Sequence, residues 1–117
     1  MPADSVHETA LKGLRLIHRG KVRDLYELDA RHMLIVATDR LSAFDVVLPD
    51  PIPGKGRMLT QISNFWFART RHIVPNHLTD YELTAWIHDP AELAMLTGRA
   101  VVVKRLRPLP IEAVVRG

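Results

Sequence analysis

Two basic side chains beside a glycine are the first arrangement in this 117-residue sequence that could do chemistry. Lys21 follows Gly20 directly, and Arg23 stands two positions further on, so the sequence predicts both cations on the same face of one strand. A glycine at the turn lets the backbone approach a ligand closely, and two cations beside it could hold a triphosphate. The alternative is a hairpin whose basic face is simply solvated.

A second arrangement directly follows the apolar run 33–37 and contains Asp39, Ser42 and Asp45. Their spacing by threes would gather two carboxylates and a hydroxyl group on one side of a helical turn. Such a group could bind an amine, an amino-acid substrate, or a Mg²⁺ ion that keeps several waters. The plainer interpretation is that Asp39 caps the turn and that Asp45 is solvated.

Charged residues near the C-terminal end give weaker signals. Lys104 emerges from the apolar run 100–103, so its amine either reaches solvent or points into a cleft. Glu112 and Arg116 are four positions apart and would share one face of a predicted strand, where they could form an ion pair. The planar guanidinium of Arg116 could equally clamp a phosphate.

Composition excludes several classes of function. The sequence has no cysteine, which rules out disulfides, thiolate metal sites and cysteine nucleophiles, and its six histidines lack metal-ligand spacing. The net charge of +3 says little by itself, but basic residues cluster at 19–23 and 99–107, which suits an anionic ligand. The few aromatic residues do not interleave with these basic ones, which favours small phosphate compounds over nucleic acid. The first eight residues do not resemble a secretory signal, and no apolar run is long enough for a membrane helix, so we expect a cytoplasmic protein.

The elements that must position these residues follow from apolar periodicity, caps and turn residues. A capping box predicts a short helix over 6–12, and Asp89 before Pro90 predicts another that Gly98 closes. The longest predicted helix has an apolar face expected in the core, made by Leu59, Ile62, Trp66 and Ile73 and widened by Phe65 and Phe67. This helix spans 59–72, and the predicted strands span 14–18, 22–28, 33–37, 99–106 and 111–115. Short connections favour antiparallel pairing, so the predicted fold class is α+β, a mainly antiparallel sheet with packed helices.

Three of these segments together resemble the motifs of SAICAR synthetase, a purine-biosynthetic enzyme. Residues 20–26 resemble its opening nucleotide loop, 37–45 its Asp-Arg-x-Ser-Ala-x-Asp segment, and 109–116 the first half of its signature pattern. Shorter matches lie between them, at 55–56, 59–60, 65–67 and 76–78. The similarity runs in order along almost the whole chain, which makes it highly specific.

The resemblance implies an ATP-dependent ligase that joins L-aspartate to the carboxylate of carboxyaminoimidazole ribotide, with ATP and Mg²⁺ as cofactors. Residues 1–105 would form the N-terminal ATP-binding lobe, and 106–117 the hinge and the start of a second lobe. Position by position, the implied nucleotide-binding residues are Gly20, Lys21, Arg23, Lys104 and Leu106, with Leu106 near the adenine. The implied catalytic pocket is Asp39, Ser42 and Asp45, and Glu112 and Arg116 would meet the ribotide.

The family signature should continue beyond Gly117, and its later magnesium-binding segment has no counterpart in this sequence. Phosphoryl chemistry needs charge stabilisation from both walls of a cleft, so we expect this chain alone to be inactive and to expose apolar surface. Two other interpretations remain open. The chain could be a non-catalytic nucleotide- or phosphate-binding module, or it could pair with a separate C-terminal half or with itself. No nucleic-acid or membrane partner is expected.

Overall fold

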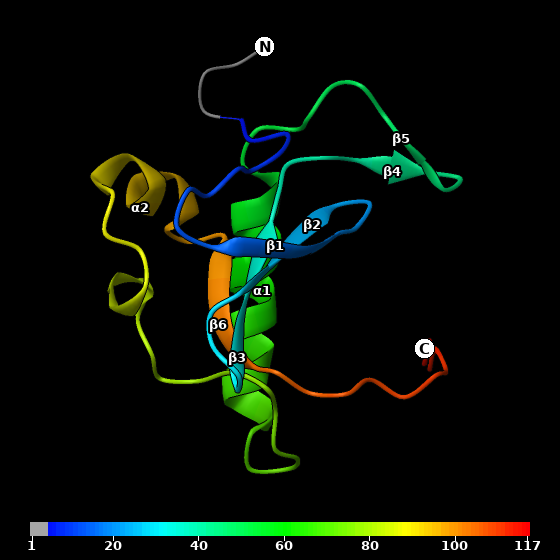
Figure 1. Ribbon diagram of the computed structural model, residues 1–117. Coiled ribbons are helices and arrows are strands. Elements are labelled where there is room, and N and C mark those ends of the chain that lie inside the picture. Colours follow the sequence, from blue (N-terminus) through cyan, green and yellow to red (C-terminus); the bar gives the residue numbers. More distant parts are fainter. Residues whose placement is uncertain (1–4) are drawn as a thin grey trace.

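An antiparallel four-stranded sheet organises the computed structural model, which describes residues 5–117 (Figure 1). The spatial order is β1-β2-β3-β6, and each neighbouring pair is antiparallel. The strands are β1 (Arg15–Arg19), β2 (Arg23–Glu27), β3 (His32–Ala37) and β6 (Ala100–Lys104). The predicted α+β class and its antiparallel sheet are therefore confirmed. Residues 1–4, part of the stretch that lacks a secretory signal, lie outside the described residues.

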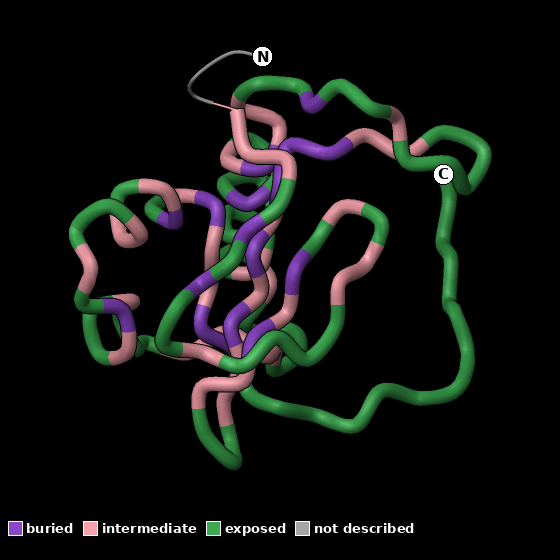
Figure 2. Tube along the Cα trace, turned by 45° about the horizontal axis from the view of Figure 1, so that its top comes forward, coloured by how far each residue is buried: buried purple, intermediate pink, exposed green. Residues whose placement is uncertain are grey.

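The hydrophobic core lies on one face of this sheet because side chains alternate along each strand. Tyr26, Leu34 and Val102 pair in register across β2, β3 and β6, and all three are buried. The N-terminal segment, the 3₁₀ turn η1 (Leu83–Ala85) and helix α2 (Pro90–Leu96) cover them, and Figure 2 shows the buried residues gathered there. Helix α2 begins as predicted, with the Asp89 carboxylate accepting the Ala91 N–H at 2.9 Å.

Helix α1 (Lys55–Thr70) lies along the opposite face of the sheet, against β3 (Figure 1). It turns Gly56 and Thr60 toward the sheet, and both are buried. A Cβ atom at Gly56 would stand 2.1 Å from the Ala37 carbonyl oxygen, so only glycine permits this close approach. The helix begins four residues before the predicted start, directly after Gly54, which has a φ of +80°.

The prediction that the apolar stripe of α1 is core is wrong. The side facing the sheet carries the smaller residues 56 and 60, and the large apolar side chains project elsewhere around the helix. Trp66 is 57% exposed and Ile73, just beyond the helix, is 72% exposed, whereas Phe67 is half-buried. Leu59, Ile62 and Phe65 are also about half exposed. We call residues 58, 59, 62, 65, 66 and 73 the α1 apolar stripe.

Three other predicted elements differ from the structure. Residues 6–12 are irregular, because their N–H groups bond to side chains of the sheet region: Val6 to Asp39 and Thr9 to Asp24. The segment after β3 forms a tight hairpin of β4 (Ser42–Ala43) and β5 (Val46–Val47) rather than a helical turn. The strand predicted over 111–115 is wrong as well: residues 105–117 are irregular and exposed, and run out from the sheet (Figure 1).

A membrane-spanning helix was not expected, and none of the helices in residues 5–117 is long and apolar enough to be one.

Candidate functional site

The turn between β1 and β2 meets the segment that follows β3, so the two sequence motifs come together in space. The Gly20 N–H closes the turn by donating to the Arg23 carbonyl at 2.8 Å. Thr38 donates to the Val22 carbonyl through both its N–H (3.0 Å) and its hydroxyl group (2.7 Å). The prediction that Lys21 and Arg23 share a strand face is wrong, because Lys21 lies in the turn and β2 begins at Arg23.

Arg40 binds this turn through a nearly buried guanidinium group. Its Nη2 donates to the Asp24 carboxylate at 2.9 Å, and the two side chains are 3% and 0% exposed. Asp24 also accepts from the N–H and hydroxyl group of Thr9. Burial by itself raises the pKa of Asp24, but the hydrogen bonds from Arg40 and Thr9 outweigh it, so the pKa lies below its ordinary value. The carboxylate is therefore held ionised.

The neighbouring residue Asp39 is equally buried and binds a different set of donors. Its carboxylate forms a two-point ion pair with Arg99, at 3.0 and 3.2 Å, and both side chains are fully buried. The same carboxylate accepts the Gly56 N–H at the start of α1 and the Val6 N–H, each at 2.8 Å. Burial raises the pKa of Asp39, but hydrogen bonds from Arg99, Gly56 and Val6 outweigh that effect and lower it.

Asp39, Ser42 and Asp45 do not gather on one side as predicted. Asp39 lies inside the protein, whereas Asp45 stands in the β4–β5 turn with a φ of +64° and is exposed. Asp45 forms an ion pair with Lys21, which lowers the pKa of Asp45. The pair links the tips of the β1–β2 and β4–β5 turns. Ser42 is half-buried in β4.

A cavity of about 320 Å³ lies between α1 and the sheet. Its apolar wall includes Val22, Ile35 and Val101, and its basic side chains include Arg23 and Lys55. Burial lowers the pKa of Lys55, an effect that the nearby positive charges of Arg23 and Arg40 increase and that Asp39 opposes. An apolar pocket that also holds cations suits a ligand with a flat apolar part and an anionic part. We call this space the α1–sheet cleft.

Lys55 did not emerge as a site residue from the sequence, because it closes a proline- and glycine-rich stretch that reads as loop. Its only signal was the Lys-Gly pair within a short stretch of the resemblance. Only the position of α1 over β3 brings its amine into the cleft.

Lys104 and Leu106 line a second cavity of about 430 Å³ near the other end of α1. This cavity and the α1–sheet cleft share Phe67 and His77, so the two spaces adjoin. The Lys104 N–H donates to the His77 carbonyl at 2.8 Å, and burial lowers the pKa of the His77 imidazole. Glu112 and Arg116 lie in the exposed irregular segment beyond, so the strand face that they were predicted to share does not form.

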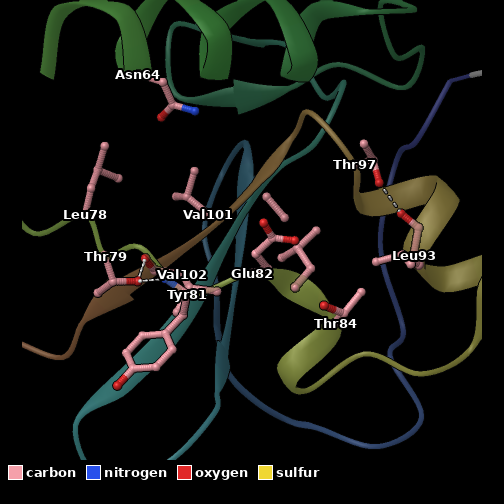
Figure 3. A pocket seen from close by; sticks show the side chains of 12 residues that line it. Asn64, Leu78, Thr79, Tyr81, Glu82, Thr84, Leu93, Thr97, Val101 and Val102 are labelled. Carbon is pink, nitrogen blue, oxygen red and sulfur yellow. Dashed lines mark hydrogen bonds between the residues drawn. The ribbon is translucent and has the colours of Figure 1, made fainter. Parts of the chain in front are cut away.

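A third cavity, of about 450 Å³, lies between the middle of α1, β6 and α2 (Figure 3). Its Thr79 and Thr97 hydroxyl groups donate to the Val102 and Leu93 carbonyls at 2.8 and 2.7 Å, drawn as dashed lines in Figure 3. Neither Lys nor Arg lines it. It therefore suits an anionic ligand less well than the α1–sheet cleft does.

Comparison with known proteins identifies a single family. A family model described as SAICAR synthetase matches residues 16–117. Phosphoribosylaminoimidazole-succinocarboxamide synthases from Methylobacillus flagellatus and Methylococcus capsulatus are 62% and 63% identical over 109 and 114 residues. These matches cover 93% and 97% of this chain but 37% and 38% of the relatives, so the chain spans less than two fifths of their length.

Two solved structures extend the comparison to the fold. SAICAR synthase from Saccharomyces cerevisiae, in complex with SAICAR, has a TM-score of 0.80 and 41% identity over 86% of this chain and 37% of its own. A type-2 SAICAR synthetase in complex with ADP has a TM-score of 0.61 at 20% identity, over 80% of this chain and 34% of its own, and shows likeness of fold alone.

Proposed function

Because the chain belongs to the SAICAR synthetase family, we propose that it forms the ATP-binding lobe of a purine-biosynthetic ligase. The observation that carries the proposal is the α1–sheet cleft, which places Arg23 and Lys55 beside an apolar wall and next to the Gly20 turn. An adenine ring fits the apolar wall, and cations fit the phosphates. ADP, which is bound in the solved structure of the type-2 SAICAR synthetase, likewise combines an adenine ring with phosphate groups.

The proposed reaction joins L-aspartate to the carboxylate of carboxyaminoimidazole ribotide. ATP supplies a phosphoryl group to that carboxylate, and the aspartate amine then displaces phosphate to form an amide, leaving ADP and phosphate. In this scheme Lys21, Arg23 and Lys55 attract the nucleotide phosphates, because all three carry positive charge at or beside the turn. Lys104 and Leu106 would meet the adenine from the adjoining cavity, as expected of a hinge.

The acceptor side of the reaction would draw on residues that are exposed in this structure. Asp45, Glu112 and Arg116 are accessible and would contact aspartate or the ribotide once a second wall is present, with Ser42 beside them. Asp39 is proposed to act indirectly, because Arg99 and two backbone amides already occupy its carboxylate.

Mg²⁺ is the second cofactor of the proposed reaction. Within residues 5–117, no group of three or more His, Cys, Asp and Glu side chains is placed to hold a metal ion. Mg²⁺ is commonly bound through substrate phosphates with only one or two carboxylates. We therefore assign it no ligand here.

The exposed apolar surface of this chain supports the proposal that a second lobe covers it. The α1 apolar stripe is open to solvent, and so are Leu109, Ile111 and Val115 in the segment after β6. Soluble monomers rarely expose large contiguous apolar patches. We propose that a second lobe, in the same chain or in a separate one, covers this surface and completes the cleft, and that self-association is the alternative when that lobe is absent.

A chimera tests the proposed function directly. Residues 1–117 would replace the matched segment of the Methylococcus capsulatus relative, while the remaining part of that protein is kept. We expect SAICAR formation that requires ATP, aspartate and the ribotide, and no turnover by the 117-residue chain alone, because both walls must stabilise the transferred phosphoryl group. A chimera that is folded and monodisperse but inactive, or an active 117-residue chain, would contradict the proposal.

Nucleotide binding by the chain itself gives a second prediction. We expect weak Mg-ATP binding that Arg23→Ala reduces by about tenfold, because the cleft loses one of its cations. Arg31→Ala is the matched control, since this exposed arginine lies in the β2–β3 turn and not in the cleft. Titration calorimetry at low salt measures both. Equal losses for the two variants would mean that the effect is general electrostatics.

A further inference from the structure

Three consecutive carbonyl groups of the β1–β2 turn are held by side chains of the segment that follows β3. The Arg40 guanidinium donates to the Gly20 carbonyl through Nη2 and to the Lys21 carbonyl through Nε, each at 3.0 Å. The Thr38 hydroxyl group donates to the next carbonyl, that of Val22, at 2.7 Å. The carbonyl groups of the turn thus face Thr38 and Arg40.

The planar trans peptide fixes where the N–H groups of this turn point. In each peptide unit the C=O of one residue lies opposite the N–H of the next. The N–H groups of Lys21 and Val22 therefore point away from the Arg40 guanidinium, and the N–H group of Arg23 points away from the Thr38 hydroxyl group. Successive backbone N–H groups that point the same way form a concave site for anions such as phosphate.

The hydrogen bonds of the Arg40 guanidinium hold this arrangement rigidly. Besides the two turn carbonyls, it donates to the His7 carbonyl through Nη1 at 2.7 Å and to the Asp24 carboxylate at 2.9 Å. Asp24 in turn accepts from Arg19 at 3.1 Å. Because the guanidinium is only 3% exposed and its donors are engaged, it cannot swing away without leaving buried polar groups unpaired.

We propose that Thr38 and Arg40 are positioning residues for nucleotide binding, which preset the amides of residues 21–23 toward the phosphate groups. The inference rests on the proposed function, because it takes the nucleotide as the anion that this turn receives. Presetting the amides removes an ordering cost that would otherwise weaken binding. The benefit applies to the phosphates and leaves the affinity for the nucleoside unchanged.

The test compares Thr38→Val and Arg40→Lys with the unchanged 117-residue chain. Thr38→Val removes the hydroxyl group that donates to the Val22 carbonyl and accepts the Arg40 N–H at 3.3 Å, and Arg40→Lys keeps the charge but loses the planar fork. Arg57→Met is the matched control, since Arg57 also donates to two backbone carbonyls, those of Thr97 and Ala94, away from the turn. Titrations with Mg-ATP and with adenosine give the two affinities, and ¹⁵N relaxation of the unliganded chain gives the order of residues 21–23.

We expect both turn variants to bind Mg-ATP about tenfold more weakly, with adenosine binding unchanged, and to show lower order in the turn. The Arg57→Met chain should match the unchanged chain in all three measurements. Equal losses for ATP and adenosine would indicate a merely structural role, and unaltered order in residues 21–23 would overturn the positioning role. If the unchanged chain binds no nucleotide, the proposed function fails, and the relaxation data alone decide whether Thr38 and Arg40 position the turn.

Discussion

Replacing Asp39 by Asn is expected to lower the free energy of unfolding by about 3–5 kcal/mol, the usual cost of removing one partner of a buried ion pair. The change leaves the fully buried Arg99 guanidinium without a counter-charge. The NH₂ group of the new amide would also face the N–H donors of Arg99 and Val6, which now donate hydrogen bonds to the carboxylate. A domain of this size has only about 5–15 kcal/mol of stability, so the variant should be marginally folded.

Urea unfolding followed by circular dichroism measures this loss, with Asp45→Asn as the control. Asp45 forms an ion pair with Lys21, but it is exposed, so its replacement should leave the stability essentially unchanged. In the double variant Asp39→Asn/Arg99→Met, the loss should be smaller than the sum of the two single losses. Equal effects at Asp39 and Asp45 would contradict the assigned role of the buried pair.

The same pair sets a pH dependence. The folded-state pKa of Asp39 is lowered from its ordinary value of 3.8, so its contribution is fully present above that value and is lost as the pH falls through the lower folded-state pKa. Asp24 acts in the same direction. The unchanged chain should therefore lose stability below about pH 4, and the Asp39→Asn chain should lose less over the same range.

Replacing Gly56 by Ala is expected to cost about 3 kcal/mol, at the upper end of the range for overpacking a tight contact. The added Cβ would stand 2.1 Å from the Ala37 carbonyl oxygen and 2.8 Å from the Arg99 Nη1. This carbonyl oxygen is part of the β3 backbone, which cannot rotate away as a side chain could, so the helix itself must move. That movement also stretches the bond from the Gly56 N–H to Asp39 and alters the α1–sheet cleft.

Gly13→Ala is the control for this substitution, because nothing lies within 4 Å of a Cβ atom at Gly13. Its effect should stay within about 0.5 kcal/mol. Thermal unfolding ranks the two variants, and Mg-ATP titration of Gly56→Ala shows whether the cleft has changed. Alanine favours helices over glycine by up to about 1 kcal/mol, so a Gly56→Ala chain that is more stable than the unchanged one would mean that α1 does not need this close contact.

Local patterns were enough to predict the family and the four strands of the main sheet. The apolar runs around Leu25, Ile35 and Val101 predict strands that pair in register, and the cap at Asp89 predicts the start of α2. Short connections predict the antiparallel pairs β1–β2 and β2–β3, because adjacent strands joined by tight turns pair that way, whereas β3 and β6 pair across a long connection. The motifs around Gly20 and Asp39 identified the family, and the comparisons confirm it.

Contacts between distant segments decided the rest. The spacing of Asp39 from Ser42 and Asp45 suggested a functional site. In the structure, Asp39 instead forms a buried ion pair with Arg99, which is 60 positions away and could not be identified from local spacing. The predicted helix over 6–12 does not form because Asp24 and Asp39 satisfy its amides from other elements. The apolar stripe of α1 gave no clue that Gly56 would face the sheet, because helix periodicity shows an apolar face but does not tell which partner covers it. The sequence by itself therefore determined which residue types and strands are available, and the tertiary structure alone decided which charges are buried and which reach the cleft.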